Sequence, residues 1–525
     1  MHITQSLRRA LQINPNGIAT IDGEQQQTWV EFAQRVAKLA SGLKHSLPLS
    51  EGDRVAILSL NGAQYLETKY ALAWAGLIAV PLNIRLAAEE LVFLLNDSET
   101  KVLIVDDTFS AMLPAFDGKL SSVETIINYD AVESTANIIS YEALIIDAEP
   151  MPDVGAGNDD TAGIFYTGGT TGLPKGVMLT HNNIVSNALN CIAGLQYDGN
   201  TRYLHAAPMF HAADAASNIA VTMFGGSHVF IDRFEPEATL KLIERHKVTN
   251  CTLVPTMINM IVNTPNASNY DTSSFKRLAY GASPMPEAVL KAAQELMPTT
   301  EFAQAYGMTE LSPLITILAP EFHDFNGPFS HRARSAGRTV LTGEIRIVDE
   351  NDQDLPNGEI GEVIARGPMV MKGYWRREQE TAEAKKNGWM HTGDAGYLDD
   401  DGFLYIADRV KDMIVSGGEN VYSVEVENAL YQHPAVESCA VIGIPSDQWG
   451  EQVHAIVILH SGQNPSQKEL LDFCKEKIAS YKVPRSIDFS DQPLPVSGAG
   501  KVLKKDTLFS LFPIFVWMLM VKDRY

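Results

Sequence analysis

The sequence predicts an α/β protein with a large N-terminal domain, in which parallel or mixed sheets are covered by helices, and a small α+β C-terminal domain. Three observations predict this class. Strand and helix patterns alternate through roughly the first 300 residues, and then the pattern changes to period two, which is typical of a β-ribbon subdomain. A short segment that mixes both patterns follows Arg409.

The first elements alternate regularly. A short apolar run at 54–60 predicts a buried strand, and apolar residues at helical spacing predict a helix at 63–75. The order repeats with a strand at 78–83, a helix at 87–98 and a strand at 101–107. A β-α-β-α-β series is typical of a parallel sheet covered by helices.

The same alternation returns in the middle of the chain. The patterns predict, in order, a strand at 227–231, a helix at 237–247, a strand at 249–256, a strand at 276–283, a helix at 286–297 and a strand at 303–307.

Later segments favour antiparallel ribbons and then a separate domain. Residues 343–367 and 395–409 alternate around turns rich in Asp, Asn, Pro and Gly. Beyond them, helical patterns at 424–430 and 468–478 accompany strand patterns, which lie at 437–444 and 453–459. We therefore expect an N-terminal domain over residues 1–410 and a C-terminal cap domain over residues 411–525.

The composition excludes two classes of protein. The 525 residues are 45% hydrophobic, too apolar for a disordered chain. The chain has 41 Lys and Arg against 64 Asp and Glu, a formal charge of −23, which argues against nucleic-acid binding because phosphates are neutralised by basic side chains. An anionic ligand would need locally placed cations.

The cysteines and the chain ends bear on location and partners. Four cysteines without a CxxC pair suit a reducing compartment, and the first residues lack the apolar run of a signal peptide, so we expect a cytoplasmic protein. Residues 508–521 form an uncharged run that is too short for a spanning helix. We expect this tail to pack on its own domain; weak membrane contact, an altered chain end and a homodimer are left open.

A glycine-rich loop at 166–176 carries the first functional signal. It follows a short apolar strand pattern and precedes a helix for which Thr180 or Asn182 is a suitable cap. It contains Gly168, Gly169, Gly172 and Gly176 with Thr167, Thr170, Thr171 and Lys175. Flexible backbone, hydroxyl donors and one cation suit a polyphosphate. It is not the common P-loop, because Pro174 precedes Lys175 and Gly176 follows it.

At this loop the chain resembles the adenylate-forming superfamily, which comprises acyl- and aryl-CoA synthetases, adenylation domains of peptide synthetases and luciferases. The resemblance extends from about residue 25 to 505 and depends on several motifs in order. After the loop these are PMFH (208–211), GASPMP (281–286), YGMTE (306–310), WMHTGD (389–394), DRVKDMIVSGGENVYSVEVE (408–427) and GAGK (498–501).

The resemblance implies that ATP, Mg²⁺ and a carboxylic acid react to give an acyl-adenylate and pyrophosphate, a reaction that depends on positioning and electrostatics. It implies that Thr309 contacts the α-phosphate and that Glu310 and Thr170 hold Mg²⁺. The residues that would bind the other phosphates are Thr167, Gly168, Gly169, Thr170, Thr171, Gly172 and Lys175.

Other site residues also follow from the resemblance. It implies that Asp394 and Arg409 bind the ribose, that His211 lies near the acyl carboxylate, and that Lys501 bridges carboxylate and phosphate during adenylation. The residues that match the adenine pocket are Gly281, Ala282, Ser283, Tyr306 and Gly307. A histidine–aspartate metal site made of His211, His205 and Asp214 has no spacing that supports it.

The second half-reaction transfers the acyl group to coenzyme A. In the family the small domain rotates between the two steps, and Lys411 occupies the hinge position, where many relatives carry Asp. The residues that match the lining of the pantetheine tunnel are Ser416, Gly417, Gly418 and Glu419.

We therefore expect an acyl-CoA synthetase that acts on a carboxylic acid. The apolar residues around Met209, Phe210, Met223 and Phe224 favour a medium- or long-chain fatty acid. Alternatives are an aryl-acid CoA ligase, a ligase that loads a carrier protein and a luciferase-like oxidase. A non-catalytic nucleotide sensor is disfavoured, because Lys175, Glu310, Asp394 and Lys501 are all present.

Overall fold

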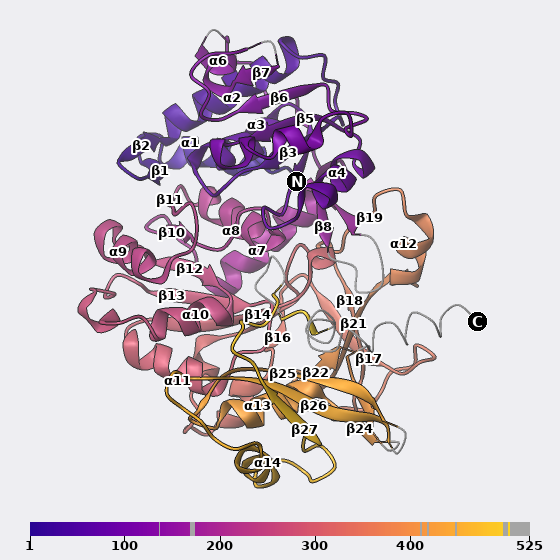
Figure 1. Ribbon diagram of the computed structural model, residues 1–525. Helices are drawn as coiled ribbons and strands as arrows, with labels where there is room; N and C mark the ends of the chain where they lie inside the picture. The colour runs from indigo at the N-terminus through magenta and orange to yellow at the C-terminus, as the bar shows by residue number, and fades with distance from the viewer. Residues whose placement is uncertain are drawn as a thin grey trace. The chain divides into compact units, whose positions relative to one another are not determined.

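The computed structural model describes residues 1–135, 137–146, 148–167, 174–409, 412–416, 419–446, 449–496 and 502–504, and Figure 1 follows the chain through them. The chain forms two compact units. The first contains residues 1–280, 297–345 and 365–391, and the second contains residues 281–296, 346–364 and those from 392 onward.

The helices of the first unit cover two large sheets. In chain order they are α1 Thr4–Ile13, α2 Trp29–His45, α3 Ala63–Trp74, α4 Ala88–Asp97, α5 Asp107–Ser110, α6 Tyr141–Ile146, α7 His181–Leu195, α8 Ala212–Met223, α9 Pro236–His246, α10 Pro255–Val262 and α12 Glu378–Ala384. Short 3₁₀ helices are η1 Leu113–Phe116, η2 Ala267–Asn269, η3 Thr309–Leu311, η4 Pro320–Phe322 and η5 Ser330–Arg334.

One sheet of this unit contains the predicted N-terminal series. In the described residues its order is β19 Gly373–Tyr374, β9 Lys175–Thr180, β8 Thr161–Thr167, β4 Ile78–Pro81, β3 Arg54–Leu58, β5 Thr100–Val105, β6 Thr125–Asn128 and β7 Ile138–Ser140. Strand β3 pairs in parallel with both β4 and β5, and helices α3 and α4 connect these strands. The predicted β-α-β-α-β order is confirmed.

The second sheet contains the strands predicted in the middle of the chain. Its order is β16 Arg338–Thr339, β15 Thr316–Leu318, β14 Glu301–Tyr306, β13 Arg277–Gly281, β12 Asn250–Leu253, β10 Arg202–His205, β11 Ser227–Phe230, β1 Ile18–Asp22 and β2 Gln25–Thr28. Strands β10 to β13 are parallel, and β15 and β16 add an antiparallel edge, so the sheet is mixed as expected.

Helix α2 shows how local sequence and packing agree in the core. Thr28 and Glu31 form a capping box: the Thr28 hydroxyl accepts from the Glu31 N–H and the Glu31 carboxylate accepts from the Thr28 N–H. The helix buries Trp29, Phe32, Val36, Leu39 and Leu43 completely. Each such side chain contributes about 1.5–3 kcal/mol through burial, so packing holds this helix more firmly than its cap does.

A third sheet contains the predicted ribbons. Its order is β17 Glu344–Val348, β18 Gly361–Arg366, β21 Trp389–Leu398 and β20 Lys385–Lys386, and β22 Leu404–Arg409 pairs with β21. The unit boundary passes through β17, β18 and β21. The β21–β22 hairpin closes where the Asp399 N–H donates to the Phe403 carbonyl and the Gly402 N–H donates to the Asp399 carbonyl.

The second unit also contains a small α+β fold. Its sheet has the order β24 Glu419–Val421, β23 Ile414–Ser416, β26 Gly450–Leu459 and β25 Val436–Ser446, and β27 Ser486–Phe489 pairs with β26. The helices of the unit are α11 Glu287–Leu296, α13 Ser423–Tyr431 and α14 Gln467–Lys475. Buried Val426, Leu430, Val441, Val457 and Leu470 form part of the core beneath α13 and α14.

One local expectation needs refinement. Residues 175–180, which follow the glycine-rich loop, form strand β9 before helix α7 begins. Thr180 rather than Asn182 caps α7, because its hydroxyl accepts from the Asn183 N–H at 3.1 Å. The loop therefore connects two antiparallel strands.

Two findings concern the ends and the cysteines. Along the described stretches, no helix combines the length and apolar character needed to cross a membrane. All four cysteines are free and buried. The apolar run at 508–521 lies outside the described residues.

Candidate functional site

The ends of the glycine-rich loop are fixed by a hairpin. Thr167 is the last residue of β8, Lys175 is the first residue of β9, and the two are directly paired. The hairpin brings the hydroxyl-bearing and the cationic end of the loop together. The loop residues Gly168, Gly169, Thr170, Thr171 and Gly172 lie outside the described residues.

The YGMTE segment forms a tight turn at the carboxyl end of β14. Tyr306 ends the strand, and Thr309 and Glu310 begin η3. A Cβ on Gly307 would lie 2.2 Å from the Pro313 carbonyl oxygen, so no other residue fits there without a backbone shift. The Asn187 amide, from α7, donates to the carbonyl oxygens of Leu311 (2.6 Å) and Leu314 (2.9 Å). Helix α7 thus fixes this turn.

Tyr374 connects the two charged residues of the candidate site. Its hydroxyl donates to Glu310 Oε1 at 2.8 Å, and Lys175 Nζ lies 5.1 Å from the centre of its ring. Burial, and then the Glu310 carboxylate, raise the pKa of Tyr374 well above its usual value, so the phenol stays protonated and remains a donor. Lys175 and Glu310, 135 positions apart by number, therefore belong to one cluster.

The sequence analysis missed Tyr374. In the string KGYW an aromatic residue reads as part of a hydrophobic core, and Tyr374 is indeed only 8% exposed. The one available signal was the adjoining Gly373, which a core strand does not require.

The cluster fits a magnesium ion bound to phosphates. Glu310 is 6% exposed and supplies carboxylate oxygen, the ligand type that Mg²⁺ prefers. The residues described contain no group of three or more His, Cys, Asp or Glu side chains that could hold a metal by themselves. Because Mg²⁺ usually takes one or two carboxylates together with substrate phosphates, a single buried Glu beside the strands of the glycine-rich loop is a suitable site.

His211 lies at the start of α8, with its ring 4.3 Å from that of Phe210. Nearby, His205 forms a buried hydrogen-bonded chain with Asp214 (2.5 Å) and His228 (2.9 Å). Burial raises the pKa of Asp214, but His205 and Lys69 outweigh it and hold that pKa well below the usual range. His205 and Asp214 thus have partners that account for their burial, and this chain is a structural network.

The remaining described site residues belong to the second unit. Gly281 is the last residue of β13, and Ala282 and Ser283 follow it directly. Ala282 has a left-handed backbone with φ +68°. Asp394 is 5% exposed and pairs across the β21–β22 hairpin with the backbone of Arg409. The hairpin therefore places the two residues expected at the ribose directly opposite each other.

The expected CoA-binding segment forms a short hairpin, in which Ser416 on β23 pairs with Glu419 on β24. Ser416 is buried and Glu419 is exposed. Lys411, Gly417, Gly418 and Lys501 lie outside the described residues.

The described residues on the two sides of Lys501 contact each other. Val496 and Val502 form an antiparallel bridge, and the Leu503 N–H donates to the Pro495 carbonyl at 2.8 Å. Lys501 is therefore the last residue of a five-residue segment, 497–501, between bridged ends.

Comparison with known proteins identifies the class. The AMP-binding enzyme family matches residues 7–375, and the AMP-binding enzyme C-terminal domain matches residues 425–501. Feruloyl-CoA synthase of an Amycolatopsis species is 39% identical over 499 residues, which cover 95% of this chain and 96% of that protein. Long-chain-fatty-acid–CoA ligase FadD13 of Mycobacterium tuberculosis is 35% identical over 461 residues, which cover 87% and 88% of the two chains.

A solved structure agrees with these relatives. The o-succinylbenzoate CoA synthetase (MenE) from Bacillus subtilis, in complex with the acyl-adenylate intermediate OSB-AMP, is 33% identical and has a TM-score of 0.82. The match covers 95% of this chain and 97% of that chain.

The chain belongs to the AMP-binding enzyme family, as the resemblance of its motifs to the adenylate-forming superfamily predicted. Within that family it is an AMP-forming acid–CoA ligase that acts on an acyl or aryl acid. Ligases of this kind use ATP, Mg²⁺ and coenzyme A.

Proposed function

We propose that this ligase activates an apolar monocarboxylic acid of the arylpropenoic type and transfers it to coenzyme A. The cluster of Lys175, Tyr374 and Glu310 beside the glycine-rich loop is the observation that carries the reaction, because a cation and a carboxylate that share one aromatic neighbour support binding of phosphate and Mg²⁺ there. The similarity to feruloyl-CoA synthase supports the choice of acid.

In this proposal the residues of the loop hold the β- and γ-phosphates. Thr167, Thr170, Thr171 and Lys175 supply donors, and Thr309 contacts the α-phosphate. Glu310 and Thr170 hold Mg²⁺, which neutralises phosphate charge when bound. Attack of the acid's carboxylate oxygen on the α-phosphorus then breaks the bond to pyrophosphate.

The proposal also assigns residues to the adenosine of ATP. Gly281–Ser283, Tyr306 and Gly307 contact the adenine, and the side chains of Asp394 and Arg409 bind the ribose hydroxyls. A carboxylate that accepts and a guanidinium that donates suit two neighbouring hydroxyls.

Two lysines and a histidine complete the proposed chemistry. His211 lies at the entrance of the acid, and Lys501 bridges the reacting carboxylate and phosphate. Lys411 is the hinge between an N-terminal domain, 1–410, and a cap domain, 411–525. The segment Ser416–Glu419 lines the path of the thiol, whose sulfur attacks the acyl carbonyl and displaces AMP.

The decisive experiment measures AMP release over a panel of acids, with and without coenzyme A. Ferulate, p-coumarate and cinnamate are compared with octanoate and palmitate. We expect CoA-dependent AMP release with the aryl acids and at most a tenth of that rate with the fatty acids, since shape and desolvation of the acyl pocket separate the two classes. Absence of both AMP release and acid-dependent pyrophosphate exchange with every acid would overturn the proposal.

A medium- or long-chain fatty acid is the second candidate. The 35% identity to the fatty-acid ligase supports it, as does the apolar segment that contains Met209 and Phe210. In the same panel a preference for octanoate or palmitate would select this candidate and leave the reaction class unchanged.

A further inference from the structure

The strands that carry the glycine-rich loop are held at both ends by residues outside the loop. Tyr166 directly precedes Thr167, and its hydroxyl donates to Asp97 Oδ2 at 2.7 Å. Gly176 directly follows Lys175, and its carbonyl accepts from the Trp375 N–H at 2.7 Å. A residue next to each end of the loop, Tyr166 before it and Gly176 after it, is therefore held by a hydrogen bond to a distant segment.

Both contacts lead to Asp97, the last residue of α4. Besides the Tyr166 hydroxyl, the Asp97 carboxylate accepts from Arg377 at 2.9 Å, and its carbonyl oxygen accepts from the Trp375 indole N–H at 2.9 Å. The Asp97 side chain is 12% exposed, so these charge-assisted bonds are partly shielded from water. One residue thus connects to the entry strand through Tyr166 and to the exit strand through Trp375.

The packing around Gly176 leaves little freedom for the exit strand. A Cβ on Gly176 would lie 2.6 Å from Ile164 Cγ2, 3.2 Å from Tyr166 Cζ and 3.4 Å from Trp375 Cβ. Tyr166 and Trp375, the two partners of Asp97, therefore close on the same glycine. Burial and the bond to Asp97 raise the pKa of Tyr166, which keeps its phenol protonated and able to donate.

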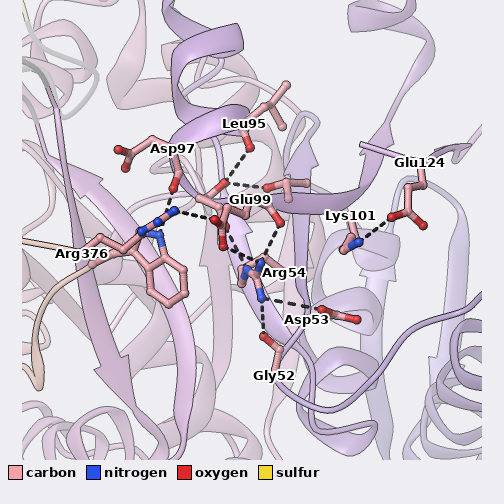
Figure 2. A network of polar contacts seen from close by, with 12 residues as sticks. Gly52, Asp53, Arg54, Leu95, Asp97, Glu99, Lys101, Glu124 and Arg376 are labelled. Carbon is pink, nitrogen blue, oxygen red and sulfur yellow. Dashed lines mark hydrogen bonds and ion pairs between the residues drawn. The ribbon is translucent and has the colours of Figure 1, made fainter. Parts of the chain in front are cut away.

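The neighbouring Glu99 provides an internal comparison. Figure 2 shows Asp97 and Glu99 close together, with Arg54 and Arg376 beside them. Glu99 forms ion pairs with Arg376 at 2.5 Å and Arg54 at 3.4 Å, and neither arginine belongs to β8 or β9. Glu99 has the charge and location of Asp97 without its contact to the loop strands.

We infer that Asp97 is a positioning residue for the glycine-rich loop: through Tyr166 and Trp375 it holds the two strand ends at the spacing that binds the terminal phosphates of ATP. This role rests on the proposed function of the loop. Strand ends that are already fixed lose less conformational freedom when a ligand binds beside them, so anchoring raises the affinity for the groups bound there.

A positioning role for Asp97 should affect the binding of ATP but not the binding of AMP. AMP lacks the β- and γ-phosphates, so its affinity should not depend on the position of the loop. A substitution that only weakens the fold would lower the affinity for both nucleotides.

The test measures the binding of a non-hydrolysable ATP analogue with Mg²⁺, and of AMP, by isothermal titration calorimetry. Asp97→Ala removes the carboxylate that accepts from Tyr166 and Arg377 and keeps the backbone carbonyl that accepts from Trp375. For this variant we expect a Kd for the ATP analogue about tenfold higher and an AMP Kd within about twofold of the wild-type value, because hydrogen bonds to charged groups are among the stronger ones. Tyr166→Phe, which removes one hydroxyl, should raise the ATP-analogue Kd about threefold. The matched control Glu99→Gln should leave both constants within about twofold.

Each result decides the inference. Unchanged ATP-analogue binding by Asp97→Ala, an equal loss of AMP binding, or an equal effect of Glu99→Gln would overturn it. If Asp97→Ala does not fold, the ratio of the two Kd values for Tyr166→Phe decides instead. A wild-type protein that binds no ATP analogue would refute the proposed function together with the role of Asp97, whereas normal wild-type binding with unaffected variants would refute the role of Asp97 alone.

Discussion

Two glycine-rich segments of this ligase end in a lysine, and the protein supports them very differently. The segment before Lys175 connects β8 and β9, two paired strands inside a large sheet, and its neighbours are packed against Tyr166, Tyr374 and Trp375. The segment before Lys501 lies between Val496 and Val502, which form an isolated bridge beside the hydrogen bond from Leu503 to Pro495.

A half-buried lysine also attaches the second segment. Lys504, three residues after Lys501, forms an ion pair with Glu427 of α13 at 2.9 Å and donates to the Ser423 hydroxyl. Burial lowers the pKa of Lys504, but Glu427 and Asp408 outweigh it and raise that pKa, so Lys504 stays charged. The attachment is strong but confined to the second unit.

This difference in support matches the different roles that we propose for Lys175 and Lys501. A lysine that binds the phosphates of ATP, as we propose for Lys175, benefits from its place in a rigid sheet. A lysine that acts only in adenylation, as we propose for Lys501, needs firm attachment to the proposed cap domain, 411–525, because that domain would move between the two steps.

The largest expected effect separates the lysines by reaction step. Lys501→Ala should lower acid-dependent pyrophosphate exchange about 10²–10³-fold, the usual cost of removing a group that stabilises charge in the transition state. Its Kd for the ATP analogue should stay unchanged. Lys175→Ala should instead raise that Kd, because its partner phosphates are present before the reaction.

A second measurement on Lys501→Ala sharpens the same point. Supplied with synthetic acyl-adenylate and coenzyme A, this variant should form acyl-CoA at nearly the wild-type rate. Pyrophosphate exchange that persists undiminished in Lys501→Ala, or a thioester step as impaired as adenylation, would contradict the division of roles.

The next effect concerns the attachment of the Lys501 segment. Lys504→Met leaves the Glu427 carboxylate buried without its cation, which should lower the free energy of unfolding of the second unit by about 3–5 kcal/mol. Scanning calorimetry of the whole chain should show an earlier transition, with ATP-analogue affinity retained below it.

Lys482 provides a matched control, because its partner lies on the same helix as Glu427. Lys482 pairs with Glu425 of α13, but the Glu425 side chain is 39% exposed against 15% for Glu427. Lys482→Met should therefore cost at most about 1 kcal/mol. The double variant Lys504→Met with Glu427→Gln should recover much of the loss; equal effects of Lys504→Met and Lys482→Met would contradict the proposed attachment.

The sequence predicted those parts of the fold that depend on local pattern. Strands β3, β4 and β5 have apolar runs of the right length, and the helices between them have an apolar face. The β-α-β-α-β order could therefore be predicted from the sequence. Strand β9 was missed because its first residues, Lys175 and Gly176, read as part of the loop.

Contacts between distant segments were not predictable from pattern. Tyr166 lies 69 residues from Asp97, and Trp375 lies 278 residues from it. From the sequence alone Asp97 is a polar residue near a helix end, and nothing in the sequence distinguishes the half-buried Lys504 from its neighbour Lys505. Such roles come from the tertiary pairing of segments whose local sequence is ordinary.

The smallest expected effect tests whether the ring of Tyr374 holds Lys175 in place. Tyr374→Phe removes only the hydroxyl that donates a hydrogen bond to Glu310. Because the Glu310 carboxylate loses this bond, the Mg²⁺ concentration for half-maximal thermal stabilisation by the ATP analogue should rise about threefold. Tyr374→Leu also removes the ring under Lys175, and a further rise of a few-fold in the ATP-analogue Kd should follow from the lost cation–π contact. If Tyr374→Leu behaves as Tyr374→Phe does, the ring does not restrain Lys175. The contrast between a lysine held in its own site and a lysine carried by a separate unit would then depend on the strand pairing alone.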